Sequence, residues 1–292
     1  MKKIISFILA AVMLMSIGAT FAVDSGEARA VIGADISDEQ KNSVYSTFGV
    51  ERGSVKELTV TNSEERQYLD GLVDSSVIGS RSISCVYIEV LEQGQGLQVD
   101  VSNINWCTRE MYINALVTAG ITDAKLIVTS PISGISGTAA LTGVYKAYED
   151  ITGETLSETA KLAGTQELVI TAELADQIGN YDAVTIVNEL KKILGQTKDM
   201  TDDQVKEEIR NIAKELNIEV SDTIINQLVK LCRSLEGLDS DELQKKVEEA
   251  QATIKKLANA QSTVSNVVES VKGFFKSIGD FFSRIFGGGD KD

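Results

Sequence analysis

The sequence predicts an α+β protein: a ferredoxin-like sheet domain followed by an all-helical region and a long C-terminal amphipathic helix. Strand and helix patterns alternate between residues 55 and 129 in the order strand, helix, strand, strand, helix, strand. This is the order of the split βαβ fold, in which two helices cover one face of a four-stranded antiparallel sheet. From residue 138 onward only helical patterns occur, and residues 243–285 carry an apolar heptad repeat.

The chain opens with the pattern of an export signal. Two lysines precede an apolar run over residues 4–17, and small residues follow it. We therefore expect residues 1–30 to be a cleaved signal peptide. Cleavage could follow Ala22 or Ala30, and Ala30 is preferred because it completes the pattern Ala28-Arg29-Ala30. An uncleaved anchor is less favoured, because the run is shorter than the ~20 residues that a membrane-spanning helix needs.

Residues 31–150 are expected to hold the sheet domain and its flanking helices. Ser37 and Gln40 form a capping box for a first helix that reaches Phe48. Residues 55–61 alternate like a strand, and a helix follows it. The remaining expected elements are strands over residues 82–91 and 97–104, a helix from Thr108 to Gly120, a strand over residues 124–129 and a helix over residues 138–149.

The strands over residues 82–91 and 97–104 flank a glycine-containing turn and are predicted to pair as a hairpin. The expected register places Val90 opposite Val99 on one face and Glu89 opposite Asp100 on the other. Facing carboxylates cost stability unless a cation or a lysine lies between them. Glu89 and Asp100 are therefore a weak candidate metal site, with plain solvation as the alternative.

The three cysteines do not form the framework of a disulfide-rich fold. Cys85 and Cys107 are a candidate disulfide, but the expected register offsets them, so a bond would need a bulge or a bend. Cys232 shares an apolar helical face with Ile225 and Val229, which favours a place in the core.

Residues 151–237 are expected to form a helical domain whose helices are separated by glycines. The expected helices cover residues 155–163, 166–178, 183–194, 205–216 and 221–235, the fourth of them beginning at a Thr201/Gln204 capping box. Before this region, the loop over residues 133–138 opens a helix and could cradle an anion with its amide groups. A plain connector is the favoured interpretation, because the loop lacks the lysine and spacing of a P-loop.

Residues 238–286 are predicted to form one long helix with an acidic cap, followed by a disordered tail over residues 287–292. Beyond residue 264 the apolar face widens to an arc of about 140° that excludes every charge. We call this face the C-terminal ridge. Its apolar members are Val264, Val267, Val268, Val271, Phe274, Phe275, Ile278, Phe281, Phe282, Ile285 and Phe286, with Lys272, Lys276 and Arg284 on the polar side.

The C-terminal ridge is expected to make a contact, for which three partners are open. Phenylalanines beside lysine and arginine suit a helix that lies in a membrane interface. The heptad spacing equally suits a coiled coil, by self-association or with a helical protein partner. The third alternative is that the helix folds back onto the helical region of its own chain.

Composition excludes several functions. Acidic residues outnumber basic ones by 43 to 28, which argues against nucleic acid as a partner. The absence of histidine removes the commonest general base and most zinc sites. We therefore expect a non-enzymatic binding or scaffolding protein without a cofactor. The alternative is a carboxylate-dependent hydrolase that acts on cell-wall glycan, although the sequence marks out no pair of carboxylates.

Several blocks of sequence resemble the YpuA-like family, secreted proteins of Gram-positive bacteria built on a domain of unknown function. The blocks are Gly33-Ala34-Asp35-Ile36-Ser37, Val86-Tyr87-Ile88-Glu89, Asn103-Ile104-Asn105-Trp106, residues 111–121 and residues 136–143. The resemblance covers roughly residues 31–236. It implies an extracytoplasmic protein associated with the cell envelope, and it brings no catalytic residues.

Overall fold

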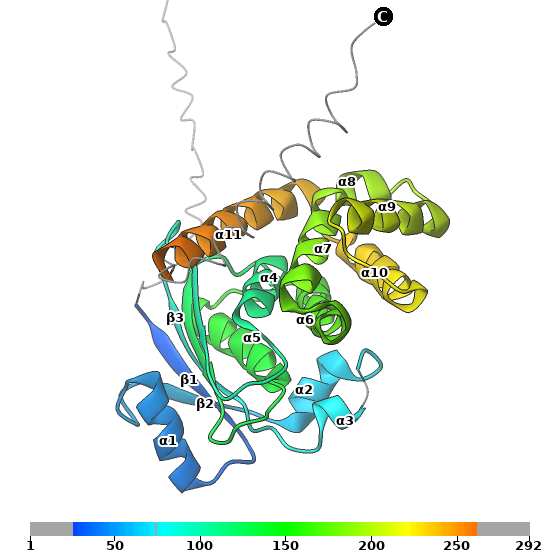
Figure 1. Cartoon of the computed structure of the whole chain (residues 1–292). Helices are drawn as coiled ribbons and strands as arrows, with labels where there is room; N and C mark the ends of the chain where they lie inside the picture. The colour runs from blue at the N-terminus through cyan, green and yellow to red at the C-terminus, as the bar shows by residue number, and fades with distance from the viewer. Residues whose placement is uncertain (1–25, 74, 262–292) are drawn as a thin grey trace, which may run out of the picture.

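The computed structural model describes residues 26–73 and 75–261, which form a five-stranded mixed sheet surrounded by helices (Figure 1). The strands are β1 (Ala28–Gly33), β2 (Lys56–Val60), β3 (Cys85–Val90), β4 (Leu97–Val101) and β5 (Ala124–Thr129), in the spatial order β2-β1-β3-β5-β4. β1 and β2 are parallel, and so are β4 and β5. Since β3 is antiparallel to both β1 and β5, it joins two parallel pairs.

Each parallel pair is connected by a helix. α1 (Asp38–Phe48) joins β1 to β2, and α4 (Arg109–Ala119) joins β4 to β5. Both helices begin at predicted caps, the hydroxyls of Ser37 and Thr108, which accept hydrogen bonds from backbone N–H groups in the first turn. α1 ends at Gly49 with φ 71°, a left-handed conformation that favours glycine. The sequence predictions for these two helices are confirmed.

The two faces of the sheet are covered by different helices (Figure 1). On one face, Ala30 and Ile32 of β1 share an apolar cluster with Tyr45 and Phe48 of α1. On the other face, Val31 belongs to the large core that α4 and α5 (Thr138–Thr152) also enter. Alternate residues of β1 therefore serve two cores, as the twofold repeat of a strand requires.

The helical part follows α5 and shares its core with the sheet. Its elements are α6 (Glu158–Ile178), α7 (Asn180–Lys192), α8 (Leu194–Thr197), α9 (Asp202–Glu215), α10 (Asp222–Leu235) and α11 (Ser240–Gln261). The short helices α2 (Asn62–Leu69) and α3 (Ser75–Ile78) pack against α6 through Leu69, Ile78 and Val169. A single apolar cluster extends from the sheet to α10 and the start of α11. The expected boundary near residue 150 therefore falls within a continuous core.

The predicted ferredoxin-like strand order is not the observed one, and the predicted hairpin is wrong. β5 lies between β3 and β4, so Val90 lies beside Ala124, and Val99 lies beside Leu126. The turn between β3 and β4 is consistent with this order: Asp123, just before β5, accepts the N–H groups of Gly94 and Gly96 at 2.8 Å each. These bonds tie the turn to the start of β5, and β5 takes the place beside β3.

Two further predictions are corrected by the backbone. Ala28, Arg29 and Ala30, which the sequence analysis assigned to the removed signal, form the first half of β1. The two helices expected on either side of Gly164 are one continuous helix, α6. A Cβ at Gly164 would lie 2.6 Å from the carbonyl oxygen of Ala115, so this glycine permits the close approach of α4 rather than a break.

Among residues 26–73 and 75–261, no helix combines the length and the hydrophobicity that crossing a bilayer requires.

Candidate functional site

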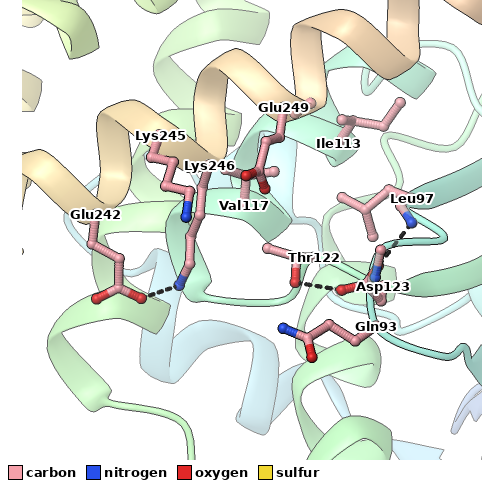
Figure 2. Close-up of a pocket in the computed structure, with 13 residues that line it drawn as sticks. Gln93, Leu97, Ile113, Val117, Thr122, Asp123, Glu242, Lys245, Lys246 and Glu249 are labelled. Atoms are coloured by element: carbon pink, nitrogen blue, oxygen red, sulfur yellow. Dashed lines mark hydrogen bonds and ion pairs between the residues drawn. The ribbon is translucent and has the colours of Figure 1, made fainter.

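A groove of about 560 Å³ lies between α11 and the turn that joins β3 to β4 (Figure 2). Its floor is made by Leu97, Ile113 and Val117, which are buried. Polar side chains form both walls: Gln93, Thr122 and Asp123 on the side of the turn, and Glu242, Lys245, Lys246 and Glu249 on α11. An apolar floor with a polar rim is typical of a surface that contacts a ligand or a partner.

Asp123 holds the turn that forms one wall. Besides the two glycine N–H groups, its carboxylate accepts a hydrogen bond from the Thr122 hydroxyl at 2.9 Å, and its backbone carbonyl accepts one from Leu91 N–H at 3.1 Å. The turn is therefore held by one residue, through both its carboxylate and its backbone carbonyl. With these bonds made, the carboxylate of Asp123 serves as a structural acceptor in the wall.

α11 forms the other wall and is fastened to the body of the protein. The carboxylate of Asp239 accepts the N–H groups of Asp241 and Glu242 at 3.1 and 2.9 Å, which confirms the predicted acidic cap. One turn apart, Leu243 and Val247 are buried in the large core, and α11 contacts α4, α7 and α8. The first residues of the predicted heptad seam thus pack on the chain's own body.

The charged groups of α11 face the groove. Lys246 Nζ lies 2.6 Å from Glu242 Oε1, one turn apart on the helix. Lys245 and Lys246 extend toward the groove in Figure 2, and Glu249 lies above Val117 and Leu97. Two lysines and three carboxylates line the space, so neither sign of charge dominates it. In the described part of the chain, no three histidine, cysteine or carboxylate residues are grouped so as to hold a metal ion.

The loop over residues 133–138 ends at Thr138, which hydrogen-bonds to a carboxyl group of the protein itself. Glu65 of α2 accepts a hydrogen bond from Thr138 Oγ1, at the start of α5, at 2.5 Å, and one from Asn62 Nδ2 at 3.3 Å. Tyr112 donates its hydroxyl to the carbonyl oxygen of Gly137 at 2.6 Å, which holds the loop against α4. At the start of α5, the Thr138 hydroxyl therefore donates to a carboxyl group of the protein itself.

Burial raises the pKa of Glu65 from its ordinary value near 4.5 to about 7, in spite of the hydrogen bonds from Thr138 and Asn62, which lower it. A carboxyl group that titrates near neutral pH is a common feature of catalytic sites. Here, however, only 2% of the residue is exposed, so a substrate has no access to it. We assign Glu65 a structural role that depends on pH.

A second polar cluster lies in the core of the helical part. Lys191 Nζ of α7 is 2.7 Å from Glu167 Oε1 of α6, and neither side chain is exposed at all. The hydroxyl of Thr118, on α4, donates to the other oxygen of Glu167 at 2.5 Å. One residue further along α7, Lys192 pairs with Glu189 at 2.6 Å, and both side chains are 4% exposed. These pairs connect or stiffen the helices that support α11.

The structure does not join the predicted cysteine pair. Cys85, Cys107 and Cys232 are all free and buried. Cys85 lies in β3, where its sulfur accepts the N–H of Gly33 at 3.4 Å, and burial raises its thiol pKa to about 12. Cys107 precedes α4 and lies close to Gly137. The core position predicted for Cys232 is confirmed.

Glu89 and Asp100 are also kept apart. They belong to β3 and β4, which β5 separates, and in the sheet Glu89 lies beside Ala28 and Lys125. Asp100 instead forms an ion pair with Arg109 at 3.0 Å. The opposition on which the candidate metal site was based is therefore absent, because the hairpin itself does not form.

The residues of the C-terminal ridge lie outside the described residues, as do residues 1–25 of the predicted signal peptide and the predicted tail. The groove, the Glu65 cluster and the Glu167–Lys191 pair were missed by sequence reasoning. Their members are far apart along the chain and form no motif. Only the Glu242–Lys246 spacing, which is that of a helical ion pair, was visible in advance.

With this architecture in view, the chain was compared with known proteins. A family model described as "Protein of unknown function (DUF1002)" matches residues 32–271, so the chain belongs to this family. The uncharacterized protein YpuA of Bacillus subtilis (strain 168) is 36% identical to it over 293 residues, which covers 98% of this chain and 100% of that protein. The resemblance inferred from the sequence blocks is confirmed. No solved structure matches the chain.

Proposed function

We propose that this protein is exported and associates with the cell envelope as a non-enzymatic binding or scaffolding protein, and that its C-terminal ridge contacts the membrane surface. The observation that carries the proposal is the anchoring of α11. Leu243 and Val247 fasten the start of the helix to the body, and the helix continues to Gln261, immediately before the segment that contains the ridge. The segment that contains the ridge thus follows a helix whose first turns are packed on the body.

The composition of the ridge favours a membrane over a protein partner. Five of the eight phenylalanines of the chain lie within residues 274–286. Residues 264–286 contain three basic and two acidic residues, whereas the whole chain has 28 basic and 43 acidic ones. The ridge segment therefore has a small net positive charge beside large apolar side chains. Such a segment suits a membrane interface, where basic residues meet anionic lipid head groups and apolar side chains enter the acyl region.

Export is supported by the N-terminal pattern of lysines, apolar run and small residues. The similarity to the relative from Bacillus subtilis covers 98% of this chain, so it is not confined to the folded body. An envelope location is the one in which a secreted protein with a membrane-binding segment would be retained.

Vesicle flotation tests the membrane contact. The mature protein is compared with a chain ending at Gln261, using phosphatidylcholine vesicles with and without phosphatidylglycerol. We expect the mature protein to float with the vesicles, more so with the anionic lipid, and the shortened chain to remain at the bottom. Equal flotation of the two chains would remove the ridge from the proposal.

Two paired substitutions sharpen this test. Phe275→Ser with Phe282→Ser removes two rings from the centre of the ridge and should abolish most of the flotation. Ser265→Ala with Ser283→Ala changes two positions outside the apolar arc and should leave flotation unchanged. A mature protein that does not float but sediments as a dimer, or captures a helical peptide, would replace the membrane with a coiled-coil partner.

The hydrolase alternative stays a prediction that no specific observation favours. A glycosidase requires two carboxyl groups that face a substrate with freedom to exchange protons. In the groove, Asp123 is occupied by two backbone N–H groups and the Thr122 hydroxyl, and Glu242 by Lys246. Neither is arranged as a general acid or base, so we do not propose a reaction.

A further inference from the structure

The position of β1 inside the sheet limits where a signal peptide could be removed from the chain. It lies between β2 and β3 and pairs with both: Arg29 lies beside Lys56 on one side and beside Ile88 on the other. The pairing begins before the strand itself, because Gly26 N–H donates to the carbonyl oxygen of Val90 at 3.0 Å. The sheet therefore includes the backbone from residue 26 onward.

Arg29 fastens β1 to two other elements. Its guanidinium donates to Asp150, at the end of α5, at 2.5 Å and to Glu27 at 2.7 Å. Asp150 also accepts from Lys56 of β2 at 2.5 Å. Arg29 is only 7% exposed, and its loss would leave Lys56 as the remaining ion-pair partner of Asp150 on the sheet.

The small residues of the Ala28-Arg29-Ala30 pattern have a structural explanation. Ala30 is fully buried and Ala28 is 9% exposed, and both pack in the cluster beneath α1 that contains Tyr45 and Phe48. The small side chains of Ala28 and Ala30 leave room for the rings of Tyr45 and Phe48, which pack against this face of the strand. The pattern that resembles a peptidase site is therefore accounted for by packing.

Cleavage after Ala30 would remove Arg29 and three of the six residues of β1. The product would lose the pairings that residues 28–30 make with β2 and β3, together with the hydrogen bond that Gly26 N–H donates to Val90. Such a chain would have to leave two strands of a five-stranded sheet partly unpaired, which a folded domain does not tolerate in its interior. We therefore expect the mature chain to retain Gly26 and all of β1.

On the assumption of export, which belongs to the proposed function, we propose that a signal peptidase hydrolyses the peptide bond between Ala22 and Val23. Water adds across this bond, which leaves a carboxylate on Ala22 of the released peptide and an amino group on Val23 of the mature protein. The substrate requirement is small side chains at the last and third-last positions before the bond, which Ala22 and Thr20 provide. Because the cut lies before Gly26, it leaves the backbone pairings described for β1 in place.

The test is the N-terminal sequence and intact mass of the full chain recovered after export from a bacterial host. We expect the protein to begin at Val23. An exported protein that begins at Val31 would overturn this inference and leave the proposed function standing. An exported chain that keeps its first 22 residues would also overturn it. An unprocessed chain found only in the cytoplasm would contradict export itself, and this inference with it.

Two sets of variants keep the inference falsifiable. Ala22→Leu should block processing and accumulate the precursor, whereas Ser25→Ala should be processed as the parent is. Processing of Ala22→Leu to a chain beginning at Val31 would contradict the proposed site. Separately, chains that begin at Val23 and at Val31 can be made without a signal. We expect a cooperative thermal transition only from the chain that begins at Val23. Equal transitions for the two chains would show that the fold does not need residues 26–30, and this would contradict the inference.

Discussion

The sheet and the helical part share one core but bury different chemistry. Between the sheet and its covering helices the core is built mainly from apolar side chains such as Val31, Val86 and Leu126, with uncharged polar residues such as Asn114 and Thr142 among them. In the helical part, α6 and α7 bury Glu167, Lys191, Glu189 and Lys192 among their apolar residues. The sheet obtains its register from backbone pairing, whereas helices can slide and rotate on apolar surfaces. We infer that the buried ion pairs fix the relative position of α4, α6 and α7.

Among the substitutions considered, Lys191→Met is expected to cause the largest loss in the free energy of unfolding. This change leaves the carboxylate of Glu167 buried without its cation, and breaking a buried pair by removing one partner costs about 3 to 5 kcal/mol. Urea denaturation at neutral pH measures the loss in the free energy of unfolding. The matched control in the sheet is Lys125→Met on β5, which lies partly exposed and should change stability by less than about 0.5 kcal/mol.

A double substitution separates loss of charge from loss of shape. Glu167→Gln with Lys191→Met removes both charges and keeps an acceptor for the Thr118 hydroxyl. We expect it to recover most of the stability that Lys191→Met loses, because no charge remains buried alone. If the single variant lost less than about 1 kcal/mol, the pair would not be the desolvated interaction that we describe.

The next largest expected effect is the change in the free energy of unfolding with pH that arises from Glu65. Its folded-state pKa, about 7, lies above the ordinary value near 4.5, so the native state holds this proton more tightly than the unfolded state does. Stability is therefore highest at low pH for this group, falls as the pH rises from about 4.5 to 7, and is constant above that range. The total penalty is up to about 3 kcal/mol, because each pKa unit corresponds to about 1.4 kcal/mol.

Glu65→Gln tests this sign directly. The amide stays neutral at all pH values and can still accept from Thr138, so the variant should be more stable than the parent at pH 9 and similar to it at pH 4. Denaturation curves of both proteins across this range provide the comparison. Glu92→Gln, at an exposed position in the β3–β4 turn, should leave the pH profile unchanged. Parallel profiles for the parent and Glu65→Gln would refute the assignment.

The smallest effect is expected for Gly164→Ala. The added methyl would lie 2.6 Å from the carbonyl oxygen of Ala115, so α4 and α6 must separate, at a cost of about 1 to 3 kcal/mol. Gly195→Ala is the control, because the nearest atom to its added Cβ is 3.8 Å away and its backbone conformation suits alanine. That change should be neutral or slightly stabilising. Equal thermal midpoints for the two variants would mean that the α4–α6 contact is looser than described.

The sequence revealed elements well and their partners poorly. Capping residues and terminal glycines located α1, α4, α9 and α10, because these signals act within one turn of a helix. The strands were also recognised, except β1, which the small residues of a signal-like pattern concealed. The pairing of β3 was wrong because alternation shows which side chains share a face, and does not show which strand lies alongside.

The buried polar clusters were harder to predict than the strand pairing, because their members are far apart in the sequence. Glu65 and Thr138, or Glu167 and Lys191, are brought together only by packing of helices, so no spacing along the chain could indicate them. Gly164 illustrates the reverse error, since a glycine within a helical pattern predicts a break unless one knows that another helix lies against it. The anchoring of α11 depends on Leu243 and Val247, the first positions of the apolar heptad repeat that the sequence showed, although the sequence left open what they contact.

The central claim is that the anchored body presents the C-terminal ridge to the membrane, and fractionation of intact exporting cells tests it most directly. The full chain and a chain ending at Gln261 are produced at equal levels, and the membrane-bound and released fractions are measured. We predict that the full chain stays with the membrane fraction and that the shortened chain is released in soluble, folded form. Equal retention of both chains would contradict the account.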